Sequence, residues 1–241
     1  MTSQTQKKDN VVLVPKHDLS PEALKIIAEK YKAIRLAGLQ SDPDAFGSSY
    51  AREIQFTEQT WVDRVLNPLG MLFIALQEDE TSPVTDDNNN NDDTVGRLLN
   101  NTWLGQAIII GPIRFPTGDG EDAARAKEVP WELLNVDLLE AAKVDIPPGS
   151  RVVYTLVGMY VRPEGRRAAN GQRLAEKAVR AVQEDCRRRG VSGLVFLLAA
   201  KGNEGAKRLY ERVGFVARGK TVVFGEEELW MLEMEVEGLS E

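Results

Sequence analysis

The residues best suited to chemistry lie in a basic segment of small residues from Gly165 to Gly171. The segment follows an apolar, strand-like run that ends at Val161, and from Gln172 onward the pattern becomes helical. The first turn of a helix leaves backbone N–H groups unpaired, and the helix dipole favours negative charge there. Small side chains let an anion approach this backbone, and Arg166 and Arg167 add positive charge. The arrangement predicts a pyrophosphate-binding site, with an ordinary strand-to-helix connection as the alternative.

Two common phosphate-binding motifs do not fit this segment. A kinase-type loop requires G-x-x-x-x-G-K-[ST], whereas five residues separate Gly165 from Gly171 and Gln172 follows. The dinucleotide fingerprint G-x-G-x-x-G is also absent. Neither a kinase-type loop nor a dinucleotide-binding loop is therefore predicted.

Two segments resemble the signatures of the GNAT superfamily of N-acyltransferases. The acyl-CoA signature is R-x-x-G-x-[GA] after a V-x-P strand end, and it is met by Val161, Pro163, Arg166, Ala169 and Gly171. Ala169 stands where the family usually has its first glycine. The other signature, N-x-x-A-x-x-x-Y-x-x-x-G-F, is met by Asn203, Ala206, Tyr210, Gly214 and Phe215. The resemblance covers roughly residues 20–236, apart from 78–93 and 115–150.

The resemblance implies an α/β fold of the α+β kind. The expected sheet is mixed, mostly antiparallel and twisted, with about 6–7 strands and about four flanking helices. The central strands ending near Val161 and Ala199 are expected to splay apart, and Gly158 suits a break at that point. The expected domain organisation is a flexible tail over residues 1–10 and one domain over 11–241.

The resemblance also implies that acetyl-CoA is the cofactor. The pantetheine arm would pair with the backbone of Met159 and Val161 as an added strand does, and the diphosphate would lie on Arg167 to Gln172. Asn203 would bond the cofactor arm or its own helix start. The full set of expected cofactor-binding residues is Met159, Tyr160, Val161, Arg166, Arg167, Ala168, Ala169, Asn170, Gly171, Gln172, Asn203, Ala206 and Tyr210.

The implied reaction is attack of a free amine on the thioester, within a ternary complex. The departing thiolate needs a proton, and a phenol with a pKa of about 10 can supply it. Tyr210 is where the family places that acid; a core aromatic is its alternative role. The amine must also lose a proton, and Glu53, a residue of segment 115–150 or a chain of water molecules could accept it. A non-catalytic acyl-CoA sensor and an interaction protein acting through residues 78–93 are the alternative functions.

A loop between the first two expected helices indicates where the acceptor binds. The segment D-P-D-A-F-G-S-S resembles a GNAT subset in which this connection lines the acceptor pocket. The candidate acceptor-binding residues are Phe46, Ser48, Ser49 and Glu53. A loop anchored by one buried phenylalanine is the alternative.

Local patterns predict the elements that position these residues. Ser20 is suited to cap a helix with Pro21 at its first position, which runs to about Leu39. A second helix holds Trp61, Val62 and Val65. Further helices are expected over Pro130 to Lys143, from Gln172 and near Asn203. Strands are expected at residues 11–14, 71–77, 94–99, 103–113, 151–161, 191–199, 221–224 and 229–236. Residues 78–93, which include four consecutive asparagines, are expected to form a disordered loop. Segment 115–150 is an insertion that serves as a lid or as surface padding.

Composition excludes some other classes of protein. The net charge of −7 is local, because seven acids and no Lys or Arg lie between Glu78 and Asp93. With one cysteine, Cys186, and one histidine, His17, the sequence offers no intrachain disulfide and no metal site. No window approaches a membrane-spanning apolar run. The expected partner is a small-molecule or peptide amine, with no nucleic acid or membrane partner and with a homodimer left open. The expected location is the cytoplasm, or alternatively the nucleus.

Overall fold

The computed structural model describes residues 10–77, 91–116, 130, 137–224 and 227–237. Within this part of the chain a seven-stranded sheet has the order β1-β2-β3-β4-β5-β7-β6. Only β4 and β5 pair in parallel; all other neighbours are antiparallel. The strands are β1 (Val11–Leu13), β2 (Gly70–Leu76), β3 (Trp103–Arg114), β4 (Arg151–Val161), β5 (Ser192–Ala200), β6 (Val216–Phe224) and β7 (Glu227–Val236). The predicted fold class is confirmed.

The described α-helices are α1 (Pro21–Ser41), α2 (Tyr50–Glu53), α3 (Glu58–Leu66), α4 (Asn91–Asn100), α6 (Leu138–Ala141), α7 (Asn170–Arg189) and α8 (Glu204–Val213). Two short 3₁₀ turns, η1 (Pro43–Ala45) and η3 (Pro163–Gly165), lie after α1 and before α7. The prediction of about four helices was too low. It missed α2, which is a single turn of four residues, and α4, whose residues were expected to form the end of a loop and a strand.

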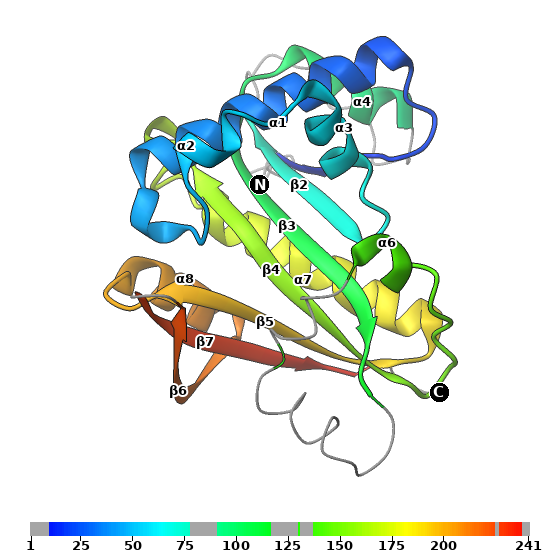
Figure 1. The fold of residues 1–241 in the computed structure, drawn as a ribbon, viewed down its shortest axis with the longest axis vertical. Helices are drawn as coiled ribbons and strands as arrows, with labels where there is room; N and C mark the ends of the chain where they lie inside the picture. Colours follow the sequence, from blue (N-terminus) through cyan, green and yellow to red (C-terminus); the bar gives the residue numbers. More distant parts are fainter. Residues whose placement is uncertain (1–9, 78–90, 117–129, 131–136, 225–226, 238–241) are drawn as a thin grey trace, which may run out of the picture.

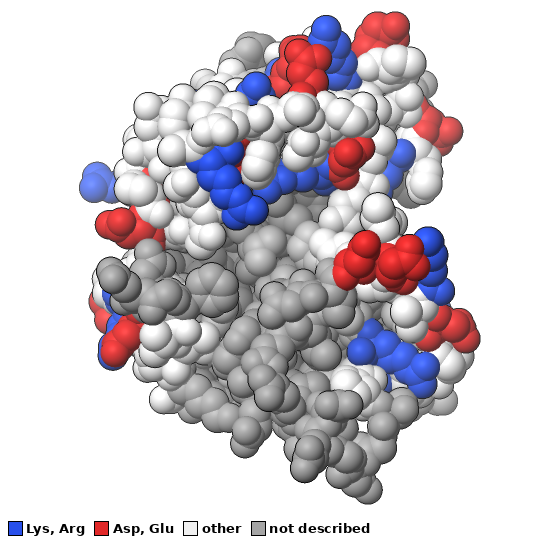
Figure 2. Space-filling model, in the orientation of Figure 1, with Lys and Arg blue, Asp and Glu red and all other residues white. Residues whose placement is uncertain are grey.

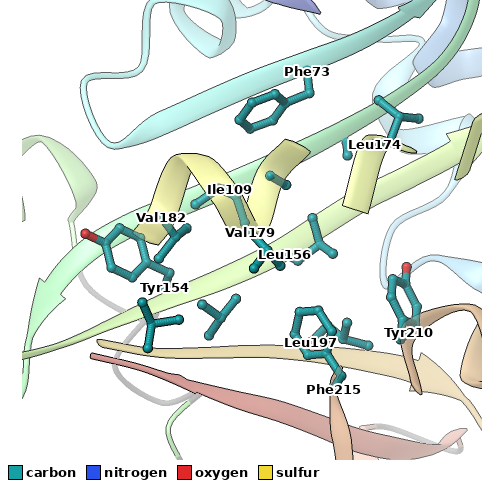
Figure 3. Packing of buried hydrophobic residues seen from close by; sticks show 14 of the residues in the cluster. Phe73, Ile109, Tyr154, Leu156, Leu174, Val179, Val182, Leu197, Tyr210 and Phe215 are labelled. Carbon is teal, nitrogen blue, oxygen red and sulfur yellow. The ribbon is translucent and has the colours of Figure 1, made fainter. Parts of the chain in front are cut away.

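The sheet lies between two layers of helices (Figure 1). On one face α7 packs its apolar residues, among them Leu174, Val179 and Val182, against side chains of β2, β3 and β4 (Figure 3). On the other face α1 and α3 cover β1–β3, and Trp61 and Ile27 are fully buried there. The two faces follow from strand alternation, since successive side chains point to opposite sides of a sheet.

The start of α1 is determined by residues that are adjacent in the sequence. The hydroxyl Oγ of Ser20 accepts a hydrogen bond from the backbone N–H of Ala23, at 3.1 Å, and Pro21 occupies the first helical position. This cap satisfies one of the N–H groups that a helix start leaves unpaired. The predicted cap is confirmed, and Ile27 and Tyr31 of this helix are buried.

The prediction of a strand over residues 94–99 is wrong, because these residues belong to α4. Leu98 is fully buried, and Lys30 donates from Nζ to the carbonyl oxygens of Leu98 (3.0 Å) and Leu99 (2.6 Å) at the helix end. The indole of Trp103 donates to Leu98 as well, at 2.9 Å. These partners come from α1 and β3, so tertiary contacts stabilise the helix over the local strand propensity. The expected disordered loop lies outside the described residues over 78–90, and its last residues, 91–93, begin α4.

The insertion is described only at its ends. The carboxylate of Asp137 caps α6 by accepting from the N–H of Leu139, at 2.8 Å. Leu138 packs against a cluster that includes Val153 and Phe196, on the sheet face opposite α7. Most of the helix expected over residues 130–143 lies outside the described residues, and α6 is its described part. The end of the insertion thus covers the same face of the sheet as α1 and α3.

Candidate functional site

The central strands β4 and β5 pair over only part of their length. Their parallel pairing runs from Arg151↔Ser192 to Thr155↔Phe196 and ends there. Beyond that point each strand continues, paired with its outer neighbour, so that the facing edges of residues 156–161 and 197–200 are not bonded to each other. Figure 1 shows the two strands diverging towards the end where α2 and α8 lie. The predicted splay is confirmed.

A bulge in β4 lies beside this opening. Ile108 of β3 pairs with Val157, and Gln106 pairs with Tyr160, so β4 holds one more residue than β3 between the two pairs. Gly158 lies in the bulge with a φ of +62°, a conformation that glycine adopts without steric cost. The side-chain amide of Gln106, fully buried, donates from Nε2 to the carbonyl oxygen of Gly158, at 3.1 Å. Gln106 therefore ties the bulge of β4 to β3.

The connection from β4 to α7 presents a row of backbone N–H groups. Among the described residues, the N–H groups from Arg167 to Gln172 donate to no backbone acceptor, and the first bonded one is that of Arg173, which donates to Ala169 at 3.0 Å. Arg167 and Ala169 have left-handed backbones, with φ values of 65° and 59°. Alternation of right- and left-handed residues turns successive N–H groups towards one point and forms an anion-binding nest. This geometry suits a diphosphate.

Side chains of this loop also hold it in shape. Asn170, which is buried, donates from Nδ2 to the carbonyl oxygen of Gly165 at 2.9 Å, and its Oδ1 accepts from Asn10 at 2.9 Å. Arg173 donates to the Oδ1 of Asn10, at 2.8 Å. The side chain of Asn170 therefore faces inward, and only its backbone N–H can serve a ligand. A Cβ at Gly171 would lie 2.8 Å from Leu209, so this glycine allows α7 to approach α8 closely.

The exposed side chains of the loop behave differently. Arg167, Ala168 and Ala169 are exposed, and Gln172 donates to Glu176 on its own helix at 2.8 Å. Arg166 donates from Nη2 to the Oδ2 of Asp42, at 2.7 Å, and from Nε to the carbonyl oxygen of Val161, at 2.9 Å.

Tyr210 lies on α8 with its ring packed edge-on against Phe215, at a centroid distance of 5.9 Å. Its hydroxyl points away from Phe215 (Figure 3) and has no hydrogen-bond partner in the part of the chain that the structure describes. Burial raises the pKa of Tyr210, so the phenol stays protonated at neutral pH. Asn203 caps α8, because its Oδ1 accepts from the N–H of Ala206 at 3.0 Å. Of its two predicted roles, the structure thus shows the helix cap.

The remaining β4 residues are placed as follows. Met159 is partly buried against the α7 side, and Val161 packs near Gly171. The ring of Tyr160 lies on the opposite face against α1, where a Cβ at Gly38 would come within 3.0 Å of it. Only the backbone of Tyr160 therefore borders the opening between the strands.

The predicted acceptor residues form two groups. Phe46 is half-buried, with the Arg35 guanidinium 4.8 Å from its ring centroid, and Ser48 is half-buried after it. Ser49 is exposed and caps α2 by accepting from the N–H of Arg52, at 3.3 Å.

Glu53 is fully buried, unlike these neighbours. Its carboxylate accepts from Arg35 at 2.8 and 3.1 Å and from Arg64 at 2.8 Å. Although burial opposes ionisation, the bonds from Arg35 and Arg64 lower the pKa of Glu53 to about 2. A carboxylate with so low a pKa is a poor proton acceptor. Its contacts favour a structural role over the two roles expected from the sequence, which were accepting the amine proton and binding the acceptor.

Sequence reasoning missed two residues at this site. Gln106 could have been found, because it is the one polar side chain in the apolar stretch W-L-G-Q-A-I-I-I of β3. Asp42 could not, because its partner Arg166 is 124 positions away. Cys186 is buried and lies on α7.

The described residues show neither a metal-binding cluster nor a helix that could span a membrane. They contain no group of three or more His, Cys, Asp or Glu side chains that could hold a metal ion. On the face shown in Figure 2, the described basic and acidic side chains are interspersed. None of the described helices combines the length and the apolar character that a membrane span requires.

Comparison with known proteins agrees with this geometry. Residues 133–215 match the model of the acetyltransferase (GNAT) family. The matched region contains β4, the nest, α7, β5 and α8. No curated protein sequence matches the chain.

Solved structures share the fold at low sequence identity. Arabidopsis thaliana NAA60, in complex with a bisubstrate analogue, superimposes with a TM-score of 0.53 and 11% identity, over 95% of this chain and 99% of that one. NAA60 in complex with acetyl-CoA gives 0.52 and 13%, over 94% and 98%. A GNAT-family acetyltransferase from Streptococcus pneumoniae gives 0.51 and 11%, over 94% and 99%. These similarities concern the fold.

Proposed function

We propose that this protein transfers the acetyl group of acetyl-CoA to a primary amine of a small molecule, an amino acid or a peptide, by direct attack in a ternary complex. One observation carries the proposal: the opening between β4 and β5 ends beside the N–H nest of Arg167–Gln172. The opening suits an extended arm, and the nest suits a diphosphate. Coenzyme A combines these two groups.

Residues of this chain fit each part of the cofactor. The backbone edges of Met159 and Val161 would bind the pantetheine arm in the manner of an added strand. Acetyl-CoA, when bound, would supply an activated thioester. The structure of NAA60 with acetyl-CoA supports this assignment, because that protein shares the fold. Backbone N–H groups along the β4 edge would stabilise negative charge on the carbonyl oxygen.

Tyr210 is the proposed general acid. Its pKa is raised by burial, so its Oη carries a proton at neutral pH, and that proton is not donated to another described side chain. A neutral phenol of this kind can protonate a departing thiolate. The amine proton would pass to water or to a residue of segment 115–150, because Glu53 is committed to two arginines.

The loop after α1 is the proposed wall of the acceptor site. Its turn η1 lies beside β5, while the end of α1 lies beside β4. The loop therefore crosses near the mouth of the opening between these strands. Phe46, Ser48 and Ser49 are the residues of this loop that we propose contact the amine acceptor.

Replacing Tyr210 by phenylalanine tests the proposal. With an amine panel and a thiol-release assay, kcat should fall by roughly 10²-fold or more, while the Kd for coenzyme A stays unchanged. Tyr154→Phe is the matched control. Tyr154 is also a buried tyrosine, but its hydroxyl donates to Asp185 at 2.7 Å on the α7 side. This control should lower stability without a comparable loss of kcat.

Two other results would contradict the proposal. If the protein bound coenzyme A but released no thiol with any amine, a non-catalytic acyl-CoA sensor would replace the enzyme. If deletion of residues 78–93 abolished binding of a protein partner and no acetylation were found, the interaction hypothesis would be favoured.

A further inference from the structure

The loop from Asp42 to Ser49 joins the two halves of the proposed site. It follows Ser41, where α1 ends beside β4, and its turn η1 lies beside β5. Because β4 and β5 do not pair at these ends, the loop spans strands that have no hydrogen bonds to one another. Among the described residues the loop also has no backbone hydrogen bond to either strand, so side-chain contacts set its position.

One end of this loop is fixed by the buried carboxylate of Glu53. Two arginines, Arg35 from α1 and Arg64 from α3, bind this carboxylate, whose side chain is 1% exposed. The Arg35 guanidinium also lies over the ring of Phe46. These contacts anchor the side of the loop that leads into α2.

The other end of the loop is held by Asp42. Its Oδ2 accepts from the hydroxyl of Ser41 at 2.7 Å and from the Nη2 of Arg166 at 2.7 Å. The Ser41 hydroxyl also lies 3.1 Å from the hydroxyl of Tyr160. Burial opposes ionisation of Asp42, but the bonds from Ser41 and Arg166 outweigh it and lower its pKa. The carboxylate is therefore charged at neutral pH.

Arg166 connects three parts of the site. It opens the phosphate-binding loop, it donates from Nε to Val161 at the end of β4, and it pairs with Asp42. Its guanidinium group thus bonds both the strand edge and the acceptor loop, and the residue directly precedes the N–H nest in the chain. A carboxylate on Arg166 also offsets positive charge that would otherwise act on a diphosphate.

We infer that Asp42 is a positioning residue for the amine acceptor, which acts by holding the loop 42–49 on Arg166 across the mouth between β4 and β5. The inference rests on the proposed function and assigns a role to a residue outside the acetyltransferase signatures. If the inference holds, removing the charge of Asp42 changes the affinities for the acceptor and for coenzyme A in opposite directions. The loop should loosen and acceptor binding should weaken, whereas coenzyme A should bind more tightly to the freed Arg166.

The experiment compares Asp42→Asn with Asp44→Asn. Asp44 lies in the same loop, is exposed and takes part in no ion pair among the described residues, so the control removes the same charge without removing the contact. For an ion pair that is partly exposed, a change of roughly two- to fivefold is expected. In the D42N variant, amide hydrogen exchange of residues 42–49 should be faster by that factor. The Kd for coenzyme A should fall by a similar factor. KM for the most active amine of a panel should rise, with kcat retained, and D44N should change each value less.

An Arg166→Gln background separates the effect of the Asp42–Arg166 contact from the effect of removing a charge. In an Arg166→Gln background, D42N should alter neither loop exchange nor the Kd for coenzyme A, because the partner is already absent. Equal effects of D42N and D44N, or an effect of D42N that persists in R166Q, would overturn the inference. A merely structural role for Asp42 would weaken coenzyme A binding or leave it unchanged, and that result also overturns it.

Failure of the proposed function would look different from failure of this inference. If the unsubstituted protein bound no coenzyme A, the acetyltransferase proposal would fall. The exchange rates of residues 42–49 would still report whether Asp42 holds the loop on Arg166.

Discussion

Replacing Ala169 by glycine should stabilise this protein. Ala169 precedes α7 with φ 59° and ψ 13°, in the left-handed region. That conformation costs an L-residue with a Cβ about 1–2 kcal/mol. Glycine avoids this cost but loses more entropy on folding, about 0.4–1 kcal/mol. Ala169 is exposed, so its methyl group contributes little packing. The net expectation is a gain of about 0.5–1 kcal/mol.

Thermal unfolding gives the measurement. For a chain of this length each kcal/mol shifts Tm by about 2–4 °C, so Tm should rise by roughly 1–4 °C. Ala168→Gly is the matched control, because Ala168 is also exposed and is not among the residues with positive φ. The control should lose about 0.4–1 kcal/mol. If both glycine variants lowered Tm equally, the left-handed backbone at residue 169 would not be the cause, and the reasoning would be refuted.

Two further predictions concern stability. Glu53 has a pKa of about 2 in the folded protein against an ordinary 4.5, so its contribution of about 3 kcal/mol is complete above pH 4.5 and is lost as the pH falls towards 2. Glu53→Gln should lower the free energy of unfolding by about 3 kcal/mol at pH 7, and urea titrations should show a flatter profile between pH 4.5 and 2; an unchanged profile would contradict the ion-pair account. Gly105→Ala would place a Cβ 2.9 Å from the carbonyl oxygen of Tyr160 and should destabilise by about 1–3 kcal/mol. Gly96→Ala, in α4 with open space around it, should instead stabilise by about 0.5–1 kcal/mol, and equal signs for the two glycines would refute the steric argument.

Much of the fold could be predicted because its signals are local. Ser20, Pro21 and the apolar spacing of α1 lie within a few positions of one another, and the structure shows the cap they predict. The strand before Ala169 and the helix after it also follow from adjacent residues. The predicted splay of β4 and β5 is confirmed as well, although it came from the family resemblance.

Predictions failed where residues distant in the sequence determine the local structure or the role of a side chain. The stretch 94–99 has strand propensity by itself, yet Lys30 and Trp103 bind its carbonyl oxygens and it forms a helix. Glu53 looked like a loop residue free to bind an acceptor. Two arginines from neighbouring helices enclose it, and its burial could not be read from its own surroundings in the sequence.

The sequence by itself determined the start of α1, through Ser20 and Pro21, and the spacing of the two segments that resemble acetyltransferase signatures, because each depends on residues close together in the chain. Only the tertiary structure decided which charges meet. Asn10 reaches Asn170 across 160 positions, and Arg166 reaches Asp42 across 124. Hydrogen bonds and ion pairs act over a few ångströms, so they become defined only after the sheet has brought those segments together.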